Sequence, residues 1–195
     1  MKQYINTLAI IILISASSFA QSLWKVDPVH SKVTFTIEHL MISHVEGEFK
    51  SFNGTVKSST SESVGGVVDF SADVNSISTN VEMRDHHLKT DDFFNAEKYP
   101  QMTFHSVAWK EVGKNHYTLT GDLTIRDKTH RVDFDVVYGG TVVDNFGNTK
   151  SGFTATTKIN RFDYGLKWNS LTNAGGIIVG KEAAIVLYLE FAPAK

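Results

Sequence analysis

The chain has 195 residues, 42% of them hydrophobic, with 19 Lys and Arg against 21 Asp and Glu and no Cys. This slightly acidic balance does not indicate a nucleic-acid partner, and the lack of Cys excludes disulfides and thiolate metal sites. A domain of this size buries about 70% of the surface of its unfolded chain, so an ordinary hydrophobic core can stabilise it.

Residues 1–20 are typical of an export signal, with a basic Lys2, an apolar run from Leu8 to Ile14 and the small-x-small site Ser18-Phe19-Ala20. The apolar run is far shorter than the roughly 20 residues of a membrane-spanning helix, and no later segment could span a bilayer. We therefore expect an exported protein, periplasmic or secreted, with one mature domain over residues 21–195. Removing the signal takes away Lys2 and no acid, which leaves 18 Lys and Arg against 21 Asp and Glu.

Alternation of apolar and polar residues predicts many strands in the mature chain. About eight amphipathic strands with little helix between them favour an all-β fold, either a closed antiparallel barrel or a two-sheet sandwich. We favour the barrel, because the strands are long and closure leaves no exposed edge. The strands are expected at about 33–37, 46–57, 68–74, 101–110, 118–126, 132–136, 153–159 and 182–192.

The phase of the alternation predicts which side chains point into the barrel, and hardly any of them is polar. A barrel of eight strands is either filled by such side chains or holds one small ligand, and the sequence leaves both readings open. The inward residues are Phe35, Ile37, Phe70, Val74, Phe104, Leu119, Phe134, Ile159 and Leu187.

The strand pattern breaks at "MRDHHLKTDDFFNAEKYP", residues 83–100. Just before it, Thr79 and Glu82 match a capping box, which predicts a short helix from about Val81 to Leu88. Thr90-Asp91-Asp92 resembles a second helix start, and Pro100 ends the segment. We expect a helical plug, residues 79–95, across one barrel end. Its apolar side chains that cap the interior are Leu88, Phe93 and Phe94.

The two adjacent histidines of the plug, His86 and His87, are a poor metal site, because neighbouring side chains on a helix point about 100° apart. We therefore expect no metal, although His30, His39, His44 and His105 are conceivable distant ligands. We also expect no cofactor and no catalytic residues. A hydrolase that uses Asp and His near the plug is an alternative, but Ser31 and His30 point to opposite strand faces and there is no Gly-x-Ser-x-Gly elbow.

Several motifs together carry a resemblance to a known family. They are Trp24-Lys25-Val26-Asp27-Pro28-Val29-His30-Ser31, Glu38-His39-Leu40, Gly47-Glu48-Phe49 with Gly54, Arg84-Asp85-His86-His87-Leu88, Asp92-Phe93-Phe94, Tyr99-Pro100, Gly121-Asp122-Leu123-Thr124-Ile125-Arg126, Ile159-Asn160-Arg161 and Gly165-Leu166. From Trp24 to about Phe191 the chain resembles the YceI-like family of exported lipid-binding proteins. It departs from the family pattern at Asp127, where Gly is usual, and at Tyr164, where Phe is more frequent.

The resemblance implies a lipocalin-like barrel that holds a long apolar lipid, a polyisoprenoid, an isoprenoid quinone or a fatty amide, for transport or storage outside the cytoplasm. On this reading the inward residues bind the ligand together with Phe49, Leu88 and Phe94. The alternative is a solid-core barrel that acts only as a protein-interaction module.

Arg161 shares a strand face with Ile159 and should point inward, where a buried cation needs an acidic partner or an anionic ligand. The sequence leaves open an ion pair with Asp85 or Asp27 and a contact with a lipid head group. His39 is a weaker head-group candidate. On the outer face of the last strand, three side chains hint at a homodimer: Ala184, Val186 and Tyr188.

Overall fold

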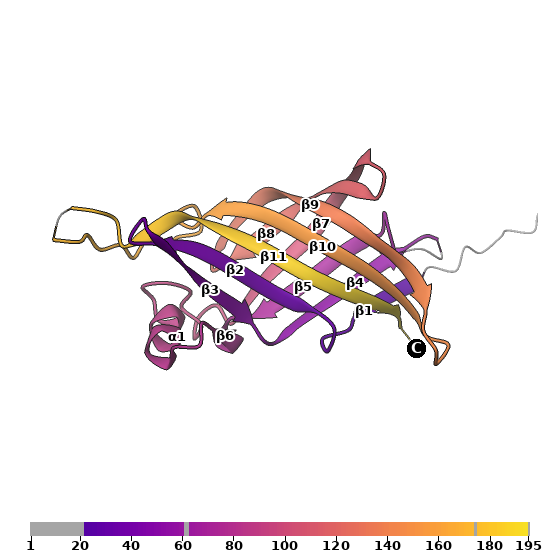
Figure 1. Ribbon diagram of the computed structural model, residues 1–195, viewed down its shortest axis with the longest axis horizontal. Coiled ribbons are helices and arrows are strands. Elements are labelled where there is room, and N and C mark those ends of the chain that lie inside the picture. Colours follow the sequence, from indigo (N-terminus) through magenta and orange to yellow (C-terminus); the bar gives the residue numbers. More distant parts are fainter. Residues whose placement is uncertain (1–21, 61–62, 174, 195) are drawn as a thin grey trace, which may run out of the picture.

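The computed structural model describes residues 22–60, 63–173 and 175–194, so the predicted export signal lies outside the described residues. Eleven strands within these ranges form one antiparallel sheet that closes on itself (Figure 1). They are β1 (Ser22–Val26), β2 (Lys32–His39), β3 (Ser43–Phe49), β4 (Phe52–Ser58), β5 (Val67–Asp73), β6 (Ile77–Ser78), β7 (Gln101–Gly113), β8 (His116–Ile125), β9 (Lys128–Val143), β10 (Thr149–Asn160) and β11 (Val179–Pro193).

In three cases two short strands lie end to end and share one position in the barrel wall. The eleven strands therefore occupy eight positions around the circumference. β1 and β2 both pair with β11, through Val26 with Phe191 and through Lys32 with Tyr188. β4 and β3 lie beside β1 and β2, and β5 and β6 lie beside β4 and β3. The remaining strands follow in chain order from β7 to β11, and the pairing of β1 with β11 closes the ring. The prediction of an antiparallel barrel of about eight strands is confirmed.

Most of the barrel is filled by side chains, including the end where residues 22 and 194 lie. There Trp24 of β1 is 2% exposed and Phe191 of β11 packs edge-on against Phe153 of β10. Further along the axis Phe104 and Phe134 make a T-shaped pair 5.2 Å apart. Burial of these large rings supplies the main stabilising free energy of the fold.

The plug crosses the opposite end of the barrel, beside β6 and β3 (Figure 1). Its helix, α1 (Glu82–Lys89), follows the short 3-10 turn η1 (Val74–Ser76) and β6. The predicted capping box is wrong. Thr79 donates both its amide and its hydroxyl hydrogen to the Asp85 carboxylate, and Val81, at the N-cap position, makes no side-chain cap bond.

The second helix predicted after Thr90 is also wrong, because the chain there forms hydrogen-bonded turns. The amides of Phe93 and Asn95 both donate to the carbonyl of Thr90. Asn95, with a φ of 52°, then takes the left-handed conformation that Asn tolerates better than most residues. In the described ranges, no helix is long and apolar enough to cross a membrane.

Candidate ligand-binding site

A cavity of about 240 Å³ lies inside the barrel next to the plug. β2, β3, the plug, β8, β10 and β11 all contribute to its wall, and most of the side chains are apolar. The lining residues are Phe35, Ile37, Glu38, His39, Val45, Arg84, His87, Leu88, Phe93, Phe94, Ile125, Ile159, Arg161, Leu166, Trp168, Ile178, Val179 and Ala183. The barrel is therefore filled over most of its length and hollow at the plug end.

Half of the side chains expected to bind a ligand line this cavity: Phe35, Ile37, His39, Leu88, Phe94, Ile159 and Arg161. They meet because β2, β10 and β11 lie side by side, with Ala183 paired to both Ile37 and Ile159. Phe49 stands directly behind the wall, with its ring 5.8 Å from that of Phe35 and 5.9 Å from that of Phe94.

The other expected residues lie further from the cavity, in the filled part of the barrel. Phe70 stacks on Phe52, and Val74 is buried in η1 where the chain leaves β5. Leu119 borders a second cavity of about 40 Å³, room for roughly one water molecule. The last three belong to the packed core: Phe104, Phe134 and Leu187.

Several lining residues were missed by the strand pattern because they lie in turns, in the plug or at a strand start. Trp168 follows β10 in an irregular segment, where no periodicity marks an inward side chain. Ile178 and Val179 were missed because β11 begins at Val179, before the expected start at about residue 182. For Trp168, the available signal was its position two residues after the Gly165-Leu166 motif.

The plug and Trp168 build an aromatic corner of the cavity. The His87 ring meets the rings of Phe93 and Trp168 edge-on, at 5.1 and 5.4 Å, and its Nε2 lies 2.9 Å from the Asp92 carboxylate. Arg84 also lines the cavity, while its guanidinium donates to the hydroxyl and the carbonyl of Thr79. The corner thus offers apolar ring faces together with two polar groups held in place by neighbours.

Arg161 is 3% exposed and donates to four backbone carbonyls, those of Leu166, Trp168, Val179 and Gly180. The ion pair with Asp85 or Asp27, one of the two alternatives left open by the sequence, is not formed, since these carboxylates accept from Thr79 and from Lys150. Burial lowers the pKa of Arg161. The guanidinium therefore ties the segment after β10 to the start of β11, and no carboxylate of the described residues pairs with its positive charge beside the cavity.

Arg126 performs a similar task from the turn between β8 and β9. Its guanidinium donates to the carbonyls of Asp91, Phe93 and Gly165 and to the Asp91 carboxylate. The turn takes its left-handed residue at Arg126, with a φ of 56°, so Asp127 is not the strained position. This conformation directs the Arg126 side chain toward the plug. Its hydrogen bonds then join the plug to the β8–β9 turn.

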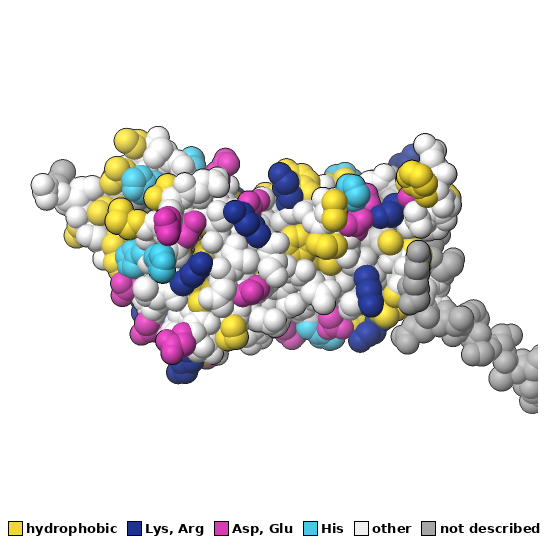
Figure 2. Space-filling view, turned by 90° about the horizontal axis from the view of Figure 1, so that it is seen from below, with side chains coloured by type: hydrophobic (Ala, Val, Ile, Leu, Met, Phe, Trp, Pro, Cys, Tyr) yellow, Lys and Arg dark blue, Asp and Glu magenta, His cyan; other side chains and the backbone are white. Residues whose placement is uncertain are grey.

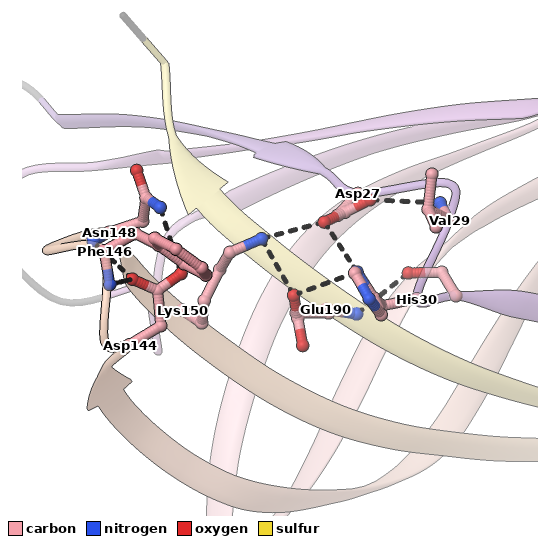
Figure 3. Close-up of polar contacts among 9 residues, drawn as sticks. Asp27, Val29, His30, Asp144, Phe146, Asn148, Lys150 and Glu190 are labelled. Carbon is pink, nitrogen blue, oxygen red and sulfur yellow. Dashed lines mark hydrogen bonds and ion pairs between the residues drawn. The ribbon is translucent and has the colours of Figure 1, made fainter.

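A cluster of charged residues lies at the other end of the barrel (Figure 3). The Lys150 ammonium is 2.8 Å from Asp27 and 2.9 Å from Glu190, and His30 Nδ1 is 3.0 Å from Asp27. Hydrogen bonds from Lys150 and His30 hold the pKa of Asp27 well below its usual range, and the two carboxylates raise that of Lys150. Asp27, His30 and Glu190 are close enough to share a metal ion, but the Lys150 ammonium already binds both carboxylates.

Comparison with known sequences places the chain among proteins of similar size. It is 36% identical to the UPF0312 protein of Staphylococcus epidermidis over 166 residues, which covers 85% of this chain and 94% of that protein. It is 35% identical over 173 residues to a UPF0312 protein of Staphylococcus aureus, with the same coverage.

Solved structures share the barrel. Burkholderia cenocepacia BcnA is 28% identical with a TM-score of 0.73, over 85% of this chain and 98% of that chain. The Campylobacter jejuni YCEI protein is 30% identical with a TM-score of 0.64, over 82% and 90%. A polyisoprenoid binding domain from Saccharophagus degradans, 14% identical with a TM-score of 0.67 over 88% and 98%, shows the same fold. The model of the YceI-like domain matches residues 24–191, and the chain belongs to the YceI-like family.

Proposed function

We propose that this protein binds an apolar lipid inside the barrel and carries or stores it. The observation that carries the proposal is the largely apolar cavity beside the plug, inside a barrel of the YceI-like family. Transfer of apolar surface from water into such a cavity is favourable by about 25 cal/mol per Å². The fold of the polyisoprenoid binding domain from Saccharophagus degradans supports an isoprenoid as the ligand class.

The size of the cavity limits how the ligand lies. A volume of about 240 Å³ has room for roughly eight water-sized groups, at about 30 Å³ for each. A lipid with several times that number of heavy atoms cannot be enclosed in this conformation. We propose that the cavity holds one end of the lipid, and that a longer part is enclosed only when the plug moves outward.

The cavity also bears on the alternatives. A solid-core interaction module requires no internal pocket, so the cavity favours the binding protein. The hydrolase hypothesis needs a catalytic Asp near the plug. Asp85 of the plug is hydrogen-bonded to Thr79 and does not line the cavity. We therefore propose a binding protein without catalytic activity.

The test is organic extraction of the purified protein followed by mass spectrometry, on a matched pair of variants. Ala183 lines the cavity, whereas Ala184 is the next residue of β11 and points to the outer face. Ala183→Phe should lower the extracted prenyl or fatty species at least about fivefold, because the new ring occupies the site. Ala184→Phe should leave it unchanged. A blank from the unaltered protein, or equal yields from the two variants, would overturn the proposal.

Export and self-association are further proposals that rest on the sequence. Export to the periplasm or beyond rests on residues 1–20 alone, and is checked by cell fractionation. A homodimer would use the outer face of β11, where Tyr188 is 53% exposed. Light scattering of Tyr188→Ser beside the unaltered protein checks it.

A further inference from the structure

Large apolar side chains are exposed at the end of the barrel where the cavity lies. Met41 and Ile42, in the turn between β2 and β3, are 57% and 85% exposed. Leu171 and Ile177, in the segment between β10 and β11, are 60% and 44% exposed. Figure 1 shows both segments at the same end of the barrel as α1, and Figure 2 shows hydrophobic side chains on the surface there. We call these four residues the apolar rim.

The two segments of the apolar rim touch each other. The amide of Leu40 donates to the carbonyl of Ile178 at 2.9 Å, and Leu171 and Ile177 form a bridge within their own segment. A Cβ atom on Gly176 would lie 3.1 Å from the terminal methyl group of Met41, so this side chain rests on the other segment. The four side chains therefore belong to one surface.

The apolar rim borders the mouth of the cavity. Ile178, the neighbour of Ile177, lines the cavity, as do Glu38 and His39 just before the β2–β3 turn. Glu38 is exposed, so the cavity reaches the surface at this edge. The apolar rim therefore lies directly beside the opening of the cavity.

The β2–β3 turn keeps its apolar side chains at an energetic cost. Leu40 and Met41 have φ values of 54° and 60°, the left-handed conformations that Asn-Gly usually supplies in such hairpins. For a residue with a side chain, this conformation costs about 1–2 kcal/mol relative to the right-handed one. Folding alone would favour small or polar residues in this exposed turn.

We propose that the apolar rim docks on the surface of a phospholipid membrane, so that the bound lipid passes between the bilayer and the cavity without crossing water. This rests on the proposed function, since the lipid cargo explains why the rim borders the mouth. Four side chains on two loop tips are too few for a stable protein interface, which buries about 800 Å² on each partner. They suit the boundary of the acyl chains, where apolar side chains sink about 5–10 Å below the headgroups. Glu38 lines the cavity, and the exposed Lys181 follows Gly180, whose Cβ position lies 3.0 Å from the Glu38 Cβ atom. The charges beside the mouth are thus of both signs, so binding should persist at high salt.

The test is flotation of the protein with phosphatidylcholine vesicles, at low salt and in 0.5 M NaCl, where the Debye length is only about 4 Å. The variant Ile42→Ser/Leu171→Ser should lower the vesicle-bound fraction at least about tenfold, because two apolar side chains lose their burial. The control is Phe146→Ser, which removes a side chain that is 90% exposed in the turn between β9 and β10, at the opposite end. An equal loss in both variants, or loss of binding at high salt, would refute the proposal.

A second measurement separates this proposal from the proposed function. Geranylgeraniol in dilute detergent should shift the tryptophan emission, because Trp168 lines the cavity, and the shift should be equal in the rim variant and in the unaltered protein. Its transfer from vesicles to protein should be at least about tenfold slower in the rim variant. Absence of an emission shift in every protein would remove the proposed function, whereas an intact shift with unchanged transfer would remove only the docking surface.

Discussion

At the scale of single residues, the buried Arg161 and the partly buried Arg126 organise the plug end of the barrel. Arg161 gives its hydrogen-bond donors to backbone carbonyls of the segment after β10 and of β11, and Arg126 gives its own to the plug and to Gly165. These carbonyls lie in the plug, in the segment after β10 and at the start of β11, and the two side chains supply hydrogen-bond donors to them. The sequence predicted that Arg161 points inward. It could not predict the acceptors, because irregular backbone has no period.

Arg161→Met should lower the free energy of unfolding by about 3–5 kcal/mol, because it leaves several buried carbonyls without donors. Urea denaturation monitored by circular dichroism measures this loss. Arg161→Lys should recover only part of it, since one ammonium cannot reach four carbonyls in a planar fork. If Arg161→Met loses lipid while its unfolding midpoint stays unchanged, Arg161 contacts the head group and its structural role is refuted.

The ion cluster at the other end predicts a pH dependence. Folding lowers the pKa of Asp27, so the charged carboxylate stabilises the folded state. This contribution is fully present above the pKa of Asp in the unfolded chain, about 4, and is lost as the pH falls below it. Asp27→Asn should therefore lose less stability than the unaltered protein between about pH 5 and pH 2. Urea midpoints across this range give the comparison, with the exposed Glu111→Gln of β7 as control. Parallel curves for all three proteins would contradict the prediction.

At the scale of elements, the strands were predictable and the plug was predictable only in outline. Phe35, Ile37 and Ile159 were placed correctly because alternation along a strand fixes which face each side chain takes. The helix of the plug was located within one residue at each end, yet its start is held by Asp85 and not by the predicted Glu82. Side chains of similar chemistry compete for the same donors, and tertiary contacts decide between them.

The close approach of β3 to β2 yields a prediction about the cavity. A Cβ atom on Gly47 would lie 2.3 Å from the Phe35 ring, so Gly47→Ala should push this ring into the cavity that it lines. We expect a loss of about 1–3 kcal/mol in unfolding free energy and weaker binding of geranylgeraniol. Gly152→Ala of β10, where a Cβ atom meets open space, is the matched control for both measurements. Binding that is unchanged in Gly47→Ala would show that Phe35 does not border the ligand.

At the scale of the whole molecule, the closure of the barrel brings the two ends of the described chain together. The amide of Ala194 donates to the carbonyl of Leu23 at 2.7 Å, and Trp24 pairs with Pro193. A circular permutant that joins residues 22 and 194 by a short Gly-Ser linker and opens the chain at Phe146 should fold, because both changes lie in exposed turns or termini. Circular dichroism and the lipid extraction assay check it. A permutant without the β spectrum would show that the ring must close from the natural ends.

Because the barrel is filled at one end and hollow at the other, one sheet provides stability and ligand binding at separate places. Packed rings and the ion cluster lie at the end with Trp24 and Phe191, whereas the cavity, the plug and the apolar rim lie at the other. Substitutions of the apolar side chains around the cavity therefore leave the packed rings and the ion cluster at the other end untouched. Evolution can alter the bound molecule at one end while the other preserves the architecture, so related barrels can diverge in cargo long before they diverge in shape.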